Sequence, residues 1–137
     1  FCNTVIGNQA LILNTEGYFN IATGYGALRS NTTGFSNTAI GAVSLKLNTG
    51  GYYNVAAGYQ SLGSNTIGSF NTANGVSALV SNIDGHSNTG SGYRSLYKNT
   101  NGHNNSAFGS WAGSFRGATG TSSNLTGSNN LYLGALV

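Results

Sequence analysis

Hydrophobic and polar residues follow each other along this chain in a pattern that returns every seventeen residues. An asparagine opens each repeat, a glycine stands four positions later, a leucine is ninth and a second asparagine is twelfth. The opening asparagines are Asn3, Asn20, Asn37, Asn54, Asn71, Asn88 and Asn105, and the leucines are Leu11, Leu28, Leu45, Leu62, Leu79 and Leu96. A fixed period of this size predicts a solenoid in which each repeat forms one coil.

Within one coil, the residue types favour strands and tight turns over a helix. The consensus is Asn-Thr-Ala-x-Gly-x-x-Ala/Ser-Leu-x-x-Asn-Thr-x-Gly-aromatic-x, best seen from Asn37 to Tyr53. Glycine costs about 1 kcal/mol relative to alanine in a helix interior, and each repeat carries two of them. We expect Asn-Thr-Ala-x-Gly to form a short strand, x-x-Ala/Ser-Leu a second strand, and Asn-Thr-x-Gly the turn that closes the coil.

The composition adds that the hydrophobic core of each coil must be small. Charged residues make up 5% of the chain and proline is absent, while glycine, asparagine, serine and threonine dominate. Coils stacked about 4.8 Å apart place each leucine on the leucine below, which makes a thin core continuous. The predicted fold is therefore an all-β parallel β-solenoid, a β-roll or β-helix, in one repeat domain covering residues 1–137. It has about seven coils and a partial one, with an inserted loop at 116–123.

The asparagines are interpreted as structural residues. Stacked asparagine side chains can form hydrogen-bonded ladders through their amides, and asparagine is also a frequent turn residue. Two such ladders are predicted, at the first and twelfth positions of the repeat. Neither is interpreted as a ligand site.

Residues that could carry catalysis or bind a metal are few. The two carboxylates, Glu16 and Asp84, are four coils apart, so they cannot act as a general acid–base pair. His86 and His103 occupy equivalent positions in adjacent repeats, which raises the question of a metal site. Aromatic residues fill the same position in other repeats, so we interpret the histidines as replacements for them. Cys2 is a single cysteine and is interpreted as a small buried hydrophobe, with an interchain disulfide as the alternative. The chain is predicted not to be an enzyme and to hold no metal and no cofactor.

The charge pattern gives little evidence for binding to nucleic acids or membranes. The net charge of +3 comes from five cations that are spread along the sequence, namely Arg29, Lys46, Arg94, Lys98 and Arg116. Nucleic-acid binding calls for a denser basic patch. No apolar run long enough to span a membrane is seen, so no membrane insertion is expected.

Two segments carry a resemblance to known repeats. Asn37–Gly41 (Asn-Thr-Ala-Ile-Gly) and the linked Asn31–Gly34 (Asn-Thr-Thr-Gly) resemble the repeats of bacteriophage tail fibres and of trimeric autotransporter adhesin heads, and Thr126–Gly134 is similar to their closing repeats. The resemblance implies a homotrimeric, left-handed parallel β-roll or β-helix. Such a fibre acts as the shaft or head of a surface-attachment protein, outside the cell, on a cell or virion surface. The chain is expected to be a fragment of a longer fibre.

Association into a homotrimer, intertwined or side by side, also has an argument from the residues. A coil with one reliable leucine and one alanine encloses little apolar area, and three chains could share an axis. The aromatic residues Tyr18, Phe35, Tyr52 and Phe70 would then be buried either between chains or beneath a turn, because an exposed aromatic stripe is an association surface. A monomeric solenoid stays open as the alternative.

Binding is expected where the repetition fails, at Trp111, Phe115, Arg116 and the loop 116–123. Exposed aromatic residues beside polar ones suit a surface carbohydrate, and loops on a rigid scaffold often carry function. Two other functions stay open. Partial threonine columns would suit an ice-binding solenoid, and open strand edges would suit a self-assembling filament, an end-to-end homopolymer.

Overall fold

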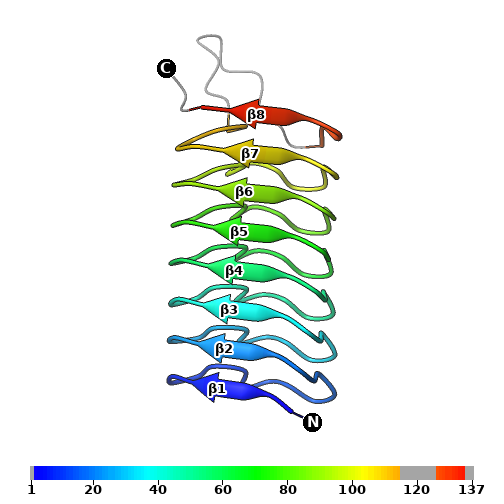
Figure 1. Cartoon of the computed structure of the whole chain (residues 1–137). Helices are drawn as coiled ribbons and strands as arrows, with labels where there is room; N and C mark the ends of the chain where they lie inside the picture. Colours follow the sequence, from blue (N-terminus) through cyan, green and yellow to red (C-terminus); the bar gives the residue numbers. More distant parts are fainter. Residues whose placement is uncertain (1, 115–125, 135–137) are drawn as a thin grey trace.

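The computed structural model of the chain describes residues 2–114 and 126–134, which form one column of stacked coils (Figure 1). Each coil contributes one strand of three residues to a parallel sheet whose strands follow chain order. The strands are β1 (Thr4–Ile6), β2 (Ile21–Thr23), β3 (Thr38–Ile40), β4 (Val55–Ala57), β5 (Thr72–Asn74), β6 (Thr89–Ser91), β7 (Ser106–Phe108) and β8 (Leu131–Leu133). The predicted all-β parallel β-solenoid is confirmed. The described residues contain no helix able to cross a membrane.

The register of the sheet repeats the period of the sequence. Ala22 of β2 lies opposite Ala39 of β3, seventeen residues later, and the other strands up to β7 pair in the same way. Between β7 and β8 the number of residues per coil is larger. Asn130 stacks on Asn105 and donates its backbone N–H to Asn105 Oδ1, 25 residues later in the sequence. The extra residues therefore enter between 114 and 126. The predicted loop 116–123 falls in this interval, outside the described residues.

The predicted second strand is wrong, since the sixth to eleventh positions form turns in each of the first six coils. Two residues in this segment have left-handed backbone conformations. In the third coil these are Val43, with φ of 54°, and Leu45, with φ of 47°. A residue in this region cannot continue a strand, and for a β-branched side chain it is a strained conformation. The left-handed residues reverse the chain within a few positions, which allows so short a coil to close.

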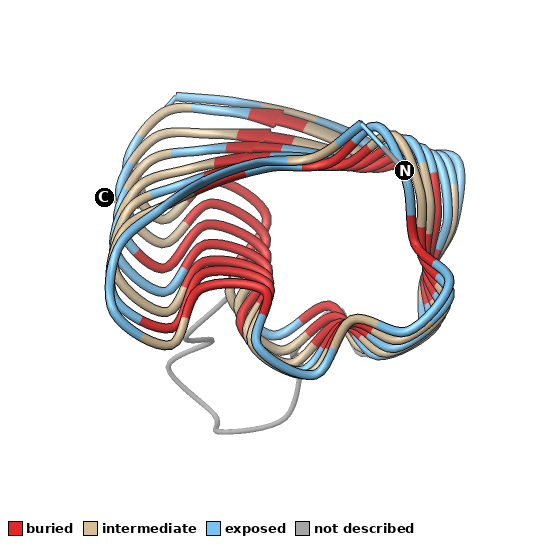
Figure 2. Cartoon of the chain, turned by 90° about the horizontal axis from the view of Figure 1, so that it is seen from below, coloured by how far each residue is buried: buried red, intermediate tan, exposed pale blue. Residues whose placement is uncertain are grey.

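A single chain buries its own core. The leucines from Leu28 to Leu96 and the alanines at the third position are completely inaccessible to solvent. Seen along the axis, the coils superimpose in one closed outline with the buried residues in repeated positions (Figure 2). A second chain is therefore not needed to enclose these columns. Any reason for association must lie in the residues outside the coil.

The glycine at the fifth position is required by the stacking of one coil on the next. Gly58 has φ of 139°, and a Cβ added there would lie 2.6 Å from the carbonyl oxygen of Gly75. An alanine would collide with backbone, which cannot move aside as a flexible side chain can. The same contact explains the glycines from Gly7 to Gly92, each of which faces the backbone of the next coil.

In the last coils, a small residue replaces the leucine of the ninth position and a large residue replaces the small one of the third position. Gly113 stands where the earlier coils have leucine, and Tyr132 stands where they have valine, alanine or glycine. A Cβ on Gly113 would lie 2.7 Å from Leu96 Cδ2 and 2.8 Å from Tyr132 Cδ2. Tyr132 packs against the apolar core, and its burial raises the pKa of its hydroxyl. The tyrosine ring thus occupies space that a leucine side chain would otherwise fill.

Candidate functional site

The asparagines at the first position form a hydrogen-bonded ladder inside the solenoid. The amide nitrogen of Asn54 donates to Asn37 Oδ1 at 3.1 Å and to the carbonyl oxygen of Gly68 at 2.8 Å. Its Oδ1 accepts from the backbone N–H of Asn71 at 3.0 Å and from the Asn71 amide at 3.2 Å. From Asn20 to Asn105 these side chains are buried, and all their polar atoms have partners within the chain. This ladder stabilises the stack and leaves no group free for a ligand.

The asparagines at the twelfth position form a second ladder that meets the first. Asn48 donates to Asn31 Oδ1 at 2.8 Å and to the carbonyl oxygen of Gly51 at 3.0 Å. The same carbonyl accepts a bond of 2.8 Å from Asn37, a member of the first ladder. A Cβ on Gly51 would lie 2.4 Å from Asn48 Oδ1, so the glycine leaves room for the amides. The two ladders therefore share one acceptor in each coil.

The threonine column at the thirteenth position also bonds along the axis. The backbone N–H groups of Thr15, Glu16 and Gly17 all donate to the carbonyl oxygen of Thr32, at 3.1, 2.9 and 3.0 Å. The Thr15 hydroxyl donates to the same oxygen at 3.1 Å, and this bond recurs in the next three coils. These hydroxyl hydrogens are directed at the neighbouring coil. The column is therefore a poor candidate for a surface that orders water.

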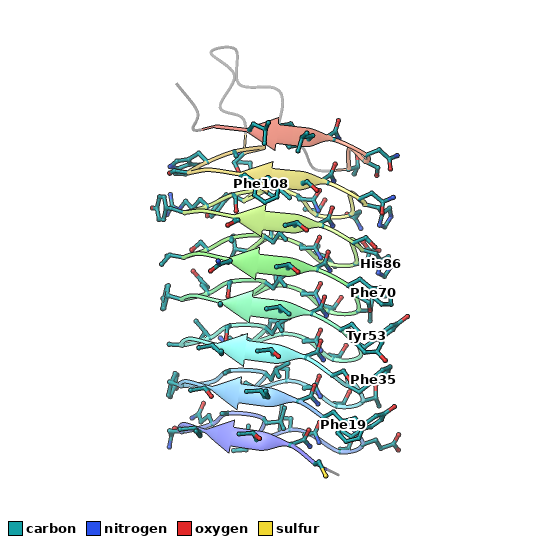
Figure 3. All side chains as sticks on the ribbon, viewed as in Figure 1. Phe19, Phe35, Tyr53, Phe70, His86 and Phe108 are labelled. Atoms are coloured by element: carbon teal, nitrogen blue, oxygen red, sulfur yellow. The ribbon has the colours of Figure 1, made fainter. Side chains whose placement is uncertain are left out.

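Exposed and half-buried aromatic rings form a continuous stripe over four coils, which we call the aromatic stripe. Its members are Tyr18, Phe19, Phe35, Tyr52, Tyr53 and Phe70. Tyr18 stacks on Phe35 with centroids 5.1 Å apart, and Phe35 stacks on Tyr52 at 4.9 Å. Phe19 and Phe70 are 61% and 52% exposed, and the labelled members lie along one edge of the stack (Figure 3). This is a large apolar surface that no part of the described chain covers.

The two histidines stand at the sixteenth position of the repeat, in coils that follow those of the aromatic stripe. Each accepts a hydrogen bond from the backbone of the preceding coil. His86 and His103 stack with ring centroids 5.3 Å apart. His86 Nδ1 accepts from the N–H of Ser69, and His103 Nδ1 accepts from the N–H of His86, each at 3.0 Å. One nitrogen of each ring is therefore already used for stacking the coils. Within the described ranges, no three His, Cys, Asp or Glu residues are grouped as a metal site. Cys2, predicted to be buried, is exposed.

Although the cations are spread along the sequence, the four in the described ranges stand at the seventh to eleventh positions of the repeat, on one turn of the coil. Arg29 and Lys46 stand at the tenth position of consecutive coils, Arg94 at the seventh and Lys98 at the eleventh. Positions seventeen residues apart are neighbours in the stack, so distance along the sequence hides this grouping. The two carboxylates both stand at the fourteenth position, on a different turn.

Two adjoining grooves run along this cationic turn. One, of about 340 Å³, is lined by Gln9, Tyr25, Arg29 and Lys46 among others. The next, of about 280 Å³, shares Lys46 and continues to Tyr59 and Gln60. We call these six residues the cationic groove. It combines positive charge, aromatic rings and amide groups on one side of the solenoid.

Trp111, predicted as a ligand-binding residue, belongs to an aromatic cage on the same turn. The Arg94 guanidinium carbon lies 5.1 Å from the ring centroids of Tyr93 and Tyr97 and 4.8 Å from that of Trp111. The buried Nε of Arg94 has no hydrogen-bond partner in the described structure. Sequence reasoning selected Trp111 and missed the other three residues, which share its turn of the repeat. Phe115 and Arg116, the other predicted binding residues, lie outside the described residues.

No family model, curated protein or solved structure matches this chain.

Proposed function

We propose that this chain is a structural and adhesive segment of a fibrous surface-attachment protein, of the bacteriophage tail-fibre or trimeric-adhesin kind. It works outside the cell, on a cell or virion surface, where it binds a host or cell-surface glycan or protein. The proposal is supported by the direction of the bonds, because both asparagine ladders and the threonine column connect each coil to the next. A chain bonded in this way is a stiff rod with long, regular sides.

The dimensions suit a spacer that also presents binding surfaces. Eight strands at the usual strand spacing give a stack roughly 34 Å long. Each coil contacts its neighbours only, as in other solenoids, so the shape is set by the repeat and needs no large globular core. The low content of charged residues leaves the sides free to carry aromatic and polar columns.

We assign the contact of the proposed homotrimer to the aromatic stripe. A contiguous exposed aromatic surface of this extent marks an association site in soluble proteins. The test is the mass of the native assembly, measured by light scattering on the natural chain and on the double variant Tyr53→Ser, Phe70→Ser. The expected result is three chains for the natural sequence and one for the variant. Phe108→Ser, which alters an exposed phenylalanine on strand β7, is the matched control and should leave the mass unchanged.

Other masses would redirect the proposal. A monomeric natural chain would overturn the homotrimer and leave the ice-binding alternative to be tested by thermal hysteresis. Long filaments would favour the end-to-end homopolymer, which strand β1 permits because it pairs with β2 on one side only.

Adhesion is tested separately by coating beads with the chain and measuring their retention on bacterial and animal cells under flow. Retention above that of beads coated with an unrelated β-solenoid supports the adhesive role. Equal retention on every surface would limit the function to that of a spacer.

A further inference from the structure

We infer that the turn carrying the cationic groove and the Arg94 cage binds a linear acidic polysaccharide, laid along the axis of the solenoid. The inference rests on the proposed function and specifies its ligand. It is carried by three observations, namely uncompensated positive charge, regularly spaced tyrosines, and a guanidinium held in place by aromatic rings.

Within residues 2–114 and 126–134, the positive charge of the groove has no ion-pair partner. Arg29 and Lys46 stand one coil apart, at a strand spacing of about 4.8 Å, where two like charges repel each other. The buried Nε of Arg29 makes no hydrogen bond in the described structure. The carboxylates of Glu16 and Asp84 stand on a different turn, at the fourteenth position. A bound carboxylate or sulfate would offset the repulsion and provide acceptors for both cations.

The tyrosines are spaced to meet successive units of a polymer. Tyr25, Tyr59 and Tyr93 stand at the sixth position of alternate coils, roughly 9.6 Å apart along the axis. They are 54%, 54% and 45% exposed, so all three can contact a ligand. The rise of one coil is close to the length of one pyranose unit in an extended polysaccharide. A chain lying along the groove would therefore place every second sugar beside a tyrosine.

Polar groups beside these rings suit sugar hydroxyls. Gln9 and Gln60 line the two parts of the groove, and the Tyr25 hydroxyl lies 3.4 Å from Gln9 Oε1. An amide offers both a donor and an acceptor, which matches the dual character of a hydroxyl group. Neutral hydrogen bonding of this kind would select a saccharide over a simple inorganic anion.

The Arg94 cage extends the same surface toward the C-terminal coils. Tyr93, Tyr97 and Trp111 surround the guanidinium and fix its position before any ligand arrives. The four cations from Arg29 to Lys98 are distributed over five coils, a stack roughly 19 Å from first to last. Duplex DNA carries one charge per about 1.7 Å, far denser than this row. The charge density favours a polymer with about one acid group for every one or two sugars.

The test measures binding of oligogalacturonate, a linear acidic saccharide, to the natural chain by calorimetry. Neutral cello-oligosaccharide and oligothymidylate are the comparison probes. We expect the acidic saccharide to bind most tightly and its affinity to fall with added salt. The double variant Arg29→Gln, Lys46→Gln should bind about tenfold more weakly or worse, because two charge-assisted contacts are lost.

A second variant tests the aromatic contribution. Tyr59→Ala should weaken binding of the acidic saccharide by about fivefold or more, since it removes one stacking surface. Phe108→Ala, which alters an exposed aromatic residue on strand β7 outside both the groove and the aromatic stripe, is the control and should leave the affinity unchanged. Circular dichroism confirms that each variant keeps the fold.

Several results would overturn the inference. These are equal affinity for the neutral saccharide, tighter binding of oligothymidylate, or unchanged affinity in both groove variants. Absence of binding to any probe would also overturn it. The bead assay would then still report on adhesion, so failure of this ligand and failure of the proposed function remain distinguishable.

Discussion

Replacing Asn54 by alanine tests the asparagine ladder at its centre. The side chain makes four hydrogen bonds, two as donor to Asn37 and Gly68 and two as acceptor from Asn71. Most of these partners keep a second bond after the substitution. The carbonyl of Gly68 still accepts from Asn65, for example. The backbone N–H of Asn71 is the exception, because Asn54 Oδ1 is the acceptor found for it.

The expected loss follows from this difference between the partners. A buried donor left without an acceptor costs about 1–3 kcal/mol, and each of the other bonds contributes about 0.5–1.5 kcal/mol net. The Asn54→Ala variant should therefore lose about 4 kcal/mol of unfolding free energy. Asn54→Asp should lose at least as much, since a carboxylate cannot donate to Asn37 or Gly68 and would be buried without a counter-charge.

The assay is equilibrium unfolding in urea, followed by circular dichroism. Asn74→Ala is the matched control, because Asn74 is an exposed asparagine on strand β5, and it should change stability by less than about 0.5 kcal/mol. A loss of less than about 1 kcal/mol at Asn54 would refute the reasoning. It would mean that water or a shifted backbone satisfies the N–H of Asn71.

Three further predictions concern single positions. Gly58→Ala should lower the midpoint of urea unfolding far more than an alanine on the surface does, because the new Cβ would lie 2.6 Å from the backbone of Gly75, and an unchanged midpoint would contradict this contact. His103→Phe should destabilise the stack by about 0.5–1.5 kcal/mol in thermal unfolding, because the exposed N–H of His86 loses its acceptor in the chain and bonds to water instead, whereas His103→Ser should retain most of the stability, since serines accept the equivalent bond in other coils. Burial raises the pKa of Tyr132 in the folded state, so its contribution to stability is fully present below the unfolded pKa of about 10 and is lost as the pH rises through the folded value. Unfolding of the Tyr132→Phe variant at alkaline pH should lack this loss, and identical pH profiles for the two chains would argue against it.

The sequence was sufficient to predict the period, the parallel stack and the position of the first strand. It was not sufficient for the second half of the coil, because the left-handed conformations of Val43 and Leu45 oppose the usual preferences of both residue types. These conformations are imposed by the closure of the coil. Local preference and fold therefore disagree at these positions, and the neighbouring coils decide the outcome.

The candidate site was only partly foreseen for a different reason. Trp111 was selected as the single tryptophan, but its partner Arg94 lies seventeen residues away in the equivalent position of the preceding coil. Arg29 and Lys46 are related in the same way. In a solenoid, side chains meet when they share a repeat position, so chemistry must be sought down the columns of the aligned repeats.

The bonds that join each coil only to the next have a consequence for how such a rod can change in length. Removing one whole repeat, such as residues 54–70, leaves the flanking asparagines able to bond to each other as before. Removing a number of residues that is not a multiple of seventeen breaks the match of both ladders, unless a loop takes up the difference, as between Asn105 and Asn130. Length in this architecture is therefore quantised, with a step of about 4.8 Å per coil. Unequal recombination between repeats would therefore lengthen or shorten the rod by whole coils.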